Sequence, residues 1–156
     1  METSAHLANH IKNVYYGGNW TVSNFKDILE DVTWQEATTQ VYGCNSIATL
    51  VFHTSYFLHV INRVIDGGPL EGNDKLSFNH PPINNKQDWE AQIQDALTAA
   101  NTMSILTAKV PNDMLWQDFS DSKYGNYFRN IQGIIEHCHY HLGQIAIIKK
   151  VVRQAE

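Results

Sequence analysis

The sequence has few cysteines, no cluster of basic residues and no long hydrophobic run. Two cysteines, Cys44 and Cys138, are too few for a disulfide framework. Lys and Arg number 11 against 16 Asp and Glu, giving a formal net charge of -5, so nucleic acid is not an expected partner. Polar residues interrupt every apolar run well before the roughly 18 residues that would span a bilayer, so we expect no membrane association.

The length and composition are those of an ordinary globular protein. The first residues lack a basic segment followed by an apolar stretch, so no secretion signal is expected and the predicted location is the cytoplasm. A hydrophobic content of 43% with 17% charged residues excludes a disordered chain. A chain of 156 residues can bury a substantial core, and we expect one domain over residues 1–156.

Hydrophobic residues recur at helical spacing in four long segments, and no segment shows the alternation of a strand. The predicted helices cover about residues 4–16, 45–65, 88–108 and 127–153, with shorter helical turns near 22–29 and 33–41. Asn45 or Ser46 is the expected N-cap of the second long helix. Polar or aromatic connections cover residues 70–86 and 114–125. This pattern predicts an all-α fold, a four-helix bundle with crossover loops.

Eight histidines are many for this length, and their helical angles divide them into groups. On the last helix, His137 and His141 are four residues apart and about 40° from each other, within the apolar stripe. His139 lies about 200° from His137 and cannot share its target. On the second helix, His53 lies at the margin of the apolar stripe, whereas His59 points about 120° away.

His53, His137 and His141 are therefore the candidate metal ligands. Each neutral imidazole can donate a lone pair to a divalent ion at about 2.0–2.1 Å, and three such ligands leave one coordination position open, as in catalytic zinc sites. The alternative is that these are core histidines that bond to the backbone or to hydroxyl groups, since two histidines four apart on a helix also arise by chance. Spacing alone leaves both interpretations open.

Two segments resemble the signatures of the DinB/YfiT-like superfamily. The segment 133–145, GIIEHCHYHLGQI, shows His, three residues, His, then one residue and Gly-Gln-Ile; the segment 46–53, SIATLVFH, is an apolar helix start leading to one histidine. The resemblance implies an up-down-down-up four-helix bundle that is often a homodimer. It also implies a metal site from one histidine of the second helix and two of the last, which are His53, His137 and His141 here.

The resemblance leaves the activity open. The superfamily includes enzymes that transfer low-molecular-weight thiols to electrophiles or use a thiol as cofactor, members described as metal-dependent hydrolases, and members without demonstrated chemistry. We expect a metal-dependent hydrolase or thiol S-transferase, in which the ion activates water or a thiol toward a small electrophilic substrate. The alternatives are a non-catalytic dimer that binds a metal or small molecule, and a purely structural bundle. Zn²⁺ or Ni²⁺ is expected first, and Fe²⁺ and Mn²⁺ also fit three histidines.

Few residues offer assistance to such a centre. Gln144, three residues after His141, is a weak catalytic candidate that would orient a ligand or substrate, or would bond locally. Cys138 is expected to be a small buried residue, and the alternative is a thiolate ligand. Glu136 points about 100° away from His137, so no general base is evident.

Three further expectations concern the surroundings of the site. Glu136 and His139 have the spacing of ferritin-like di-iron motifs, but no second motif accompanies them, so a di-iron site is not expected. Trp116 and Phe119 are candidates for apolar walls of a pocket. Val14 and Ile105 are candidates for a dimer seam.

Overall fold

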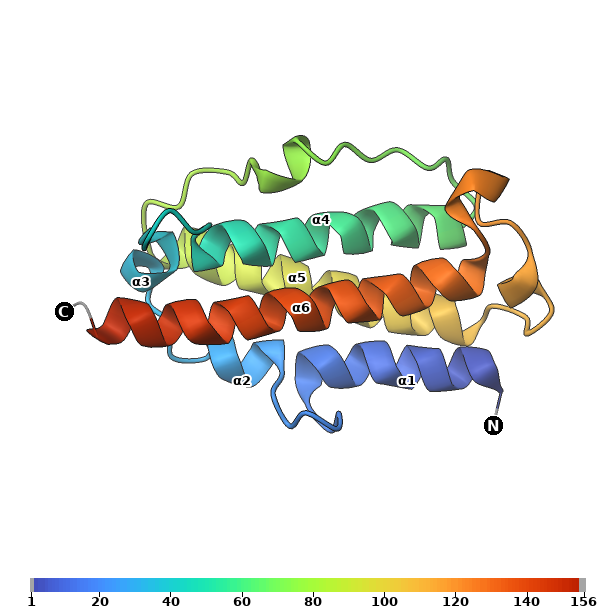
Figure 1. Ribbon diagram of the computed structural model, residues 1–156, viewed down its shortest axis with the longest axis horizontal. Coiled ribbons are helices and arrows are strands. Elements are labelled where there is room, and N and C mark those ends of the chain that lie inside the picture. Colours follow the sequence, from blue (N-terminus) through green and yellow to red (C-terminus); the bar gives the residue numbers. More distant parts are fainter. Residues whose placement is uncertain (1, 155–156) are drawn as a thin grey trace.

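The computed structural model describes residues 2–154, and this part of the chain is all-helical, as predicted (Figure 1). Apart from one isolated bridge, the described residues contain no strand. The long helices match the expected segments to within two residues: α1 (Thr3–Tyr16), α4 (Ile47–Ile65), α5 (Lys86–Ala108) and α6 (Tyr127–Gln154). The short elements are α2 (Phe25–Leu29), α3 (Trp34–Thr38) and the 3₁₀ turns η1 (Leu76–Phe78), η2 (Met114–Trp116) and η3 (Ser122–Tyr124).

Local side-chain chemistry sets the ends of α4, which carries one of the candidate ligands. Ser46 is the N-cap, and its Oγ accepts a hydrogen bond of 3.1 Å from the backbone N–H of Thr49. At the other end, Gly67 adopts a φ of 90°, and the N–H of Gly68 donates to the carbonyl of Arg63 at 2.8 Å. This is a Schellman motif, which satisfies the last carbonyls and stops the helix.

The two short helices near the N-terminal third are shorter than predicted. α2 begins at Phe25 instead of near residue 22, because the Asn24 side chain caps it by accepting from Asp27 N–H. Val22, with a φ of 66°, lies in the left-handed region outside the helix. α3 likewise ends at Thr38, before the expected residue 41.

The four long helices lie alongside one another, with α1 and α6 running in one direction and α4 and α5 in the other (Figure 1). α4 packs against α5 and α6, and α1 packs against the same two helices. The connection from α4 to α5 returns along the full length of the molecule beside α4, which allows these two consecutive helices to run parallel. This connection carries η1 onto α4.

Most of the buried hydrophobic residues of the described chain form one cluster between the long helices. Val14 belongs to this cluster and is only 1% exposed, so its assignment to a dimer seam was wrong. Its side chain instead faces the interior of the bundle, beside Leu58 of α4 and Ile134 of α6. Ile105, the other seam candidate, is 49% exposed.

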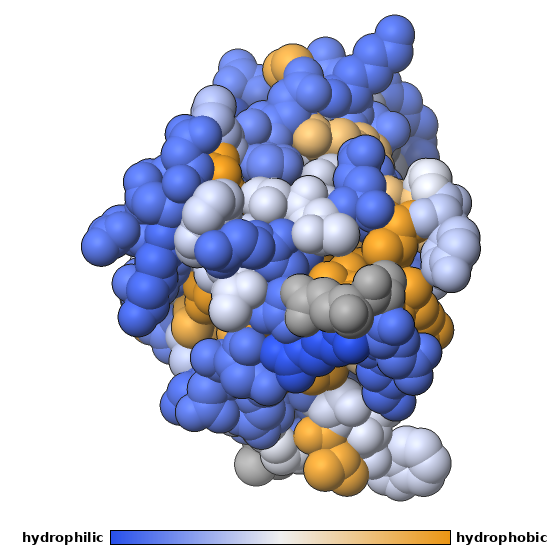
Figure 2. All heavy atoms as spheres, turned by 90° about the vertical axis from the view of Figure 1, so that its left-hand side faces the viewer, coloured by the Kyte–Doolittle hydropathy of each residue, from blue (hydrophilic) through white to orange (hydrophobic). Residues whose placement is uncertain are grey.

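The surface at the end where α6 finishes is mainly hydrophilic, with hydrophobic residues in small separate patches (Figure 2). Within residues 2–154, none of the helices is both long enough and apolar enough to span a bilayer.

Candidate metal centre

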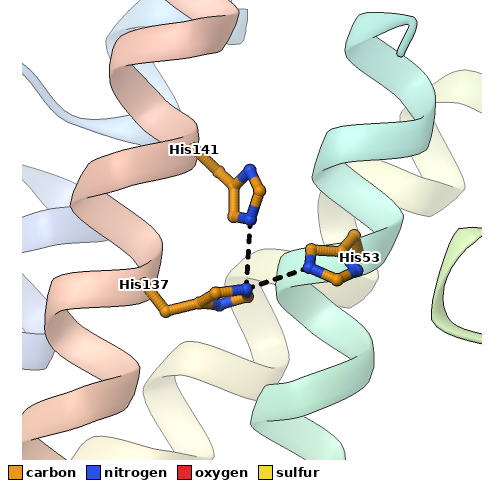
Figure 3. Close-up of side chains that lie close together, drawn as sticks. All are labelled: His53, His137 and His141. Carbon is orange, nitrogen blue, oxygen red and sulfur yellow. Dashed lines mark hydrogen bonds between the residues drawn. The ribbon is translucent and has the colours of Figure 1, made fainter. Parts of the chain in front are cut away.

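The side chains of His53, His137 and His141 meet between α4 and α6 (Figure 3). Nε2 of His137 lies 2.9 Å from Nε2 of His53 and 3.1 Å from Nε2 of His141. One ring nitrogen from each residue lies within 4.8 Å of the other two, so the three residues could hold a metal ion. Tetrahedral ligands at 2.0–2.1 Å from a zinc ion are about 3.3 Å apart, so small ring movements would suffice.

The hydrogen bonds of Ser77 fix the proton position on His53. Ser77 lies in η1, is fully buried, and its hydroxyl donates to the backbone carbonyl of Asp74 at 2.6 Å. With its only proton used, Ser77 Oγ accepts from Nδ1–H of His53 across 2.8 Å. The neutral His53 ring therefore keeps its lone pair on Nε2, directed toward the other two histidines.

A side-chain amide plays the same part for His141. Gln144 Oε1 lies 2.7 Å from Nδ1 of His141, while its Nε2 donates to the Tyr140 hydroxyl at 3.2 Å. An amide oxygen only accepts, so Nδ1 of His141 carries the proton and Nε2 carries the lone pair. Gln144, the weak catalytic candidate, thus bonds locally to a candidate ligand, one of the two roles expected for it.

The third ring cannot satisfy both neighbours. Nε2 of His137 faces the lone pairs of His53 and His141, yet it can donate only one proton. Its Nδ1 is buried without a hydrogen-bond partner among the described residues. At least one of the two close nitrogen–nitrogen contacts therefore has no proton between its atoms, and a cation shared by the three nitrogens would make both contacts favourable.

Burial keeps the three rings neutral. Desolvation, with the neighbouring His141, lowers the pKa of His53 to about 4. Desolvation and the two neighbouring rings lower the pKa of His137 to about 4, and desolvation also lowers the pKa of His141. Neutral imidazole is the form that ligates metals, so the site is in its ligating state across the neutral range.

Aromatic side chains hold the His53 ring in place. Phe78 of η1 stacks on it with ring centroids 4.1 Å apart and an interplanar angle of 20°. Phe57, one turn along α4, meets the same ring edge-on at 5.1 Å. These contacts restrict rotation of the ring, so its Nε2 stays directed at the cluster.

A pocket of about 520 Å³ opens beside His53 and His137. Its volume is within the range of small-molecule sites. The connection between α4 and α5 contributes Asp74 to its lining, and the connection between α5 and α6 contributes Lys123 and Tyr124. The prediction that Trp116 and Phe119 form apolar walls of the pocket was wrong, because neither residue lines it. Trp116 is 61% exposed and stacks on Phe128, whereas Phe119 is buried against Tyr127. The lining apolar residues are Phe57, Ile61 and Ile134.

Comparisons with protein-family models, with curated proteins and with solved structures found no match for this chain.

The remaining candidates lie outside the cluster. His139 faces His10 of α1, with ring centroids 6.1 Å apart. His59 of α4 pairs with Asp95 of α5, and both side chains are about half exposed. Glu136 is exposed, and the described metal-ligand group contains no carboxylate, so the structure gives no support for a di-iron site. The helical angles had predicted that His139, His59 and Glu136 point away from the candidate ligands, and the structure agrees.

Cys138 is also outside the cluster. It is buried, and its Sγ lies 3.4 Å from the Tyr15 hydroxyl. Burial raises the pKa of this thiol to about 12, so it is a protonated core residue instead of a thiolate ligand.

Sequence reasoning missed the groups that surround the three histidines. Ser77 and Asp74 belong to a polar connection that showed no pattern, and Lys123, Arg129 and Asn130 gave no recognisable motif. Only the fold brings these residues beside His53, because their distance along the chain carries no signal of contact.

Proposed function

We propose that His53, His137 and His141 hold one divalent metal ion and that the protein is a cytoplasmic metal-dependent enzyme of the DinB/YfiT-like type, with its four long helices forming that family's bundle. The observation that carries the proposal is the direction of the lone pairs. Ser77 and Gln144 each accept a hydrogen bond from the Nδ1–H of a histidine, which leaves two Nε2 lone pairs facing His137 Nε2. Such outer hydrogen bonds typically orient metal-ligating histidines.

The pocket supports a catalytic role over a structural one. A structural zinc site is closed by four protein ligands, whereas three histidines leave a position for an exogenous ligand. Here the rings of His53 and His137 line a pocket of about 520 Å³. When bound, the ion would lower the pKa of a water molecule or thiol at its remaining position. The proposed reactions are hydrolysis of, or thiol transfer to, a small electrophilic substrate.

Asp74 supplies the base that the sequence did not reveal. It lines the pocket, and its charge acts on the neighbouring His53. We assign its carboxylate the role of proton acceptor for the attacking nucleophile. Replacement by asparagine would keep the shape of the side chain and the backbone carbonyl that accepts from Ser77, so metal binding is expected to survive while turnover falls.

Metal analysis of the purified protein tests the proposal. We expect one equivalent of Zn²⁺ or Ni²⁺ in the native protein and in His139→Ala, and loss of the ion in His137→Ala. The two replaced histidines are two residues apart on α6, but His139 faces His10 on α1. A native protein that neither contains nor takes up a divalent ion would overturn the metal site and leave a structural bundle.

A non-catalytic binding protein is the second candidate. The two functions separate in a panel of thiol plus electrophile, ester and amide substrates, assayed with the metal-loaded protein and with Asp74→Asn. Turnover that depends on both the metal and Asp74 supports the enzyme. Bound metal without turnover across the panel supports the non-catalytic alternative.

We also propose that the protein is a homodimer, as the superfamily resemblance implies. With Val14 buried, exposed Ile105 on α5 is the remaining seam candidate. Light scattering tests this, and a monomeric mass would overturn it.

A further inference from the structure

Arg129 lines the pocket beside the histidine cluster and has no carboxylate partner among residues 2–154. The other two arginines of the chain do have partners: Arg63 pairs with Glu71, and Arg153 with Asp31 and Glu36. Asp74, on the connection side of the same pocket, makes no ion pair with Arg129 in the described structure. The guanidinium therefore lines the pocket without an ion pair to any described carboxylate.

The backbone around η3 positions this guanidinium. One of its terminal nitrogens donates to the carbonyl of Tyr124 at 3.2 Å, and Asn130 donates to the same carbonyl at 3.0 Å. Gly125, with a φ of 76°, leaves the space that the side chain crosses, because a Cβ there would lie 2.8 Å from Cδ of Arg129. One donor is used in this anchoring, which leaves most of the five N–H donors of the fork for a ligand.

The location of Arg129 is unfavourable for helix stability by itself. It stands in the first turn of α6, where the positive end of the helix dipole disfavours a cation, and that turn contains no acidic residue. Lys123 adds a second cation to the same pocket, and its carboxylate partner among the described residues is the half-exposed Asp121. A positioned cation at the positive end of a helix is suited to an anion that comes from outside the chain.

The pocket also has apolar lining residues. Phe57, Ile61 and Ile134 line it together with His53 and His137. From these observations we infer that the substrate has an apolar body and an anionic end group, a carboxylate, sulfonate or phosphate, which Arg129 binds with support from Lys123. The inference rests on the proposed function in taking this pocket as the substrate site, and it assigns that site a substrate class.

A pair of isosteric probes tests the inference without any turnover. 3-Phenylpropionate and its neutral amide are titrated by NMR into the metal-free protein, after removal of the chelator, and into the zinc-loaded protein. We expect the acid to bind about fivefold more tightly than the amide in both forms, as an exposed Arg–carboxylate pair would give. The metal-free arm excludes direct ligation of the carboxylate to the ion as the source of the preference.

Variants of two arginines complete the test. Arg129→Gln is expected to abolish the preference for the acid, Arg129→Lys to retain part of it, and Arg63→Gln, which removes an equal charge outside this pocket, to leave it unchanged. Equal binding of acid and amide by the wild-type protein, absence of binding up to the solubility limit, or a preference that survives Arg129→Gln would overturn the inference. Metal content is measured on the same samples, so failure of the metal site is recorded separately from failure of the anion site.

Discussion

Ser77, in the connection between α4 and α5, accepts a hydrogen bond from Nδ1 of His53 at 2.8 Å and so directs the opposite nitrogen of that ring at His137. A residue 24 positions away along the chain thus sets the proton on a candidate ligand. The relationship matters because an imidazole with its proton on Nε2 could not ligate an ion at this point.

Replacement of Ser77 is expected to weaken metal binding without removing a ligand. In Ser77→Ala the Nδ1 proton of His53 loses its acceptor, and the metal affinity should fall about tenfold or more. Competition with a chromophoric chelator measures this. Ser55→Ala is the matched control, because Ser55 is also buried but its hydroxyl bonds to the backbone carbonyl of Phe52. Equal losses in the two variants would contradict the orienting role of Ser77.

Gln144 is expected to act through His141. Gln144→Leu removes the acceptor for the Nδ1 proton and should lower metal affinity about tenfold. Gln144→Glu should keep the affinity or raise it, because a carboxylate oxygen accepts from the same N–H. Gln132→Leu, at a half-buried position on the same helix whose side chain bonds to Glu136, serves as the control. If Gln144→Leu left the affinity unchanged, the amide would have no part in positioning His141.

Metal binding should stabilise the fold. The three histidines come together only in the folded chain, so the ion binds the folded state and not the unfolded one. Free Zn²⁺ at 100 times its dissociation constant would therefore raise the free energy of unfolding by about 2.7 kcal/mol. Chemical denaturation with and without the ion measures the difference. His53→Ala should lose this dependence, whereas His59→Ala should keep it, since His59 faces Asp95. A stabilisation that persisted in His53→Ala would place the bound ion elsewhere.

Arg153 near the end of α6 should stabilise the fold in a pH-dependent way. Its hydrogen bond lowers the pKa of Glu36 to about 2, and bonds from Lys149 and Arg153 lower the pKa of Asp31 to about 2. Both carboxyl groups titrate near 4 in the unfolded chain, so their contribution is complete above about pH 5 and is lost as the pH falls toward 2.

Urea denaturation of Arg153→Gln across this range tests the linkage. At neutral pH the variant should be less stable by about 1 kcal/mol or less, because Asp31 is 61% exposed and solvent screens the pair. This difference should shrink as the pH falls from about 5 to 2. Arg63→Gln, whose partner Glu71 is 69% exposed, is the comparison with the smaller expected effect. A difference that grew at low pH would contradict the assigned sign.

The two cysteines should differ in reactivity. Cys44 is exposed, whereas Cys138 is buried with a pKa raised to about 12 by desolvation. A thiol reagent at mildly alkaline pH should modify one thiol of the folded chain and two of the unfolded chain, because only an accessible thiolate reacts. In Cys44→Ser the folded protein should not react. Rapid modification of Cys138 in the folded protein would reopen its candidacy as a ligand.

Sequence alone determined the long helices and the three converging histidines. Helical spacing placed His137 and His141 on one face and excluded His139, because rotation per residue is a local property of the backbone. Strong end signals, such as the glycines after α4, likewise act within a few residues. The predicted start of the short helix α2 was too early. Its apolar pattern is weak, and the capping side chain of Asn24 sets the actual start.

Only the tertiary structure decided what surrounds the histidines. The contact between Ser77 and His53 depends on how a patternless connection returns along α4, and the position of Arg129 depends on the space left by Gly125. Burial of Val14 and exposure of Trp116 were also decided by packing. The physical reason is that helical periodicity specifies which residues share a face, whereas the neighbours of that face are set by packing between distant segments of the chain.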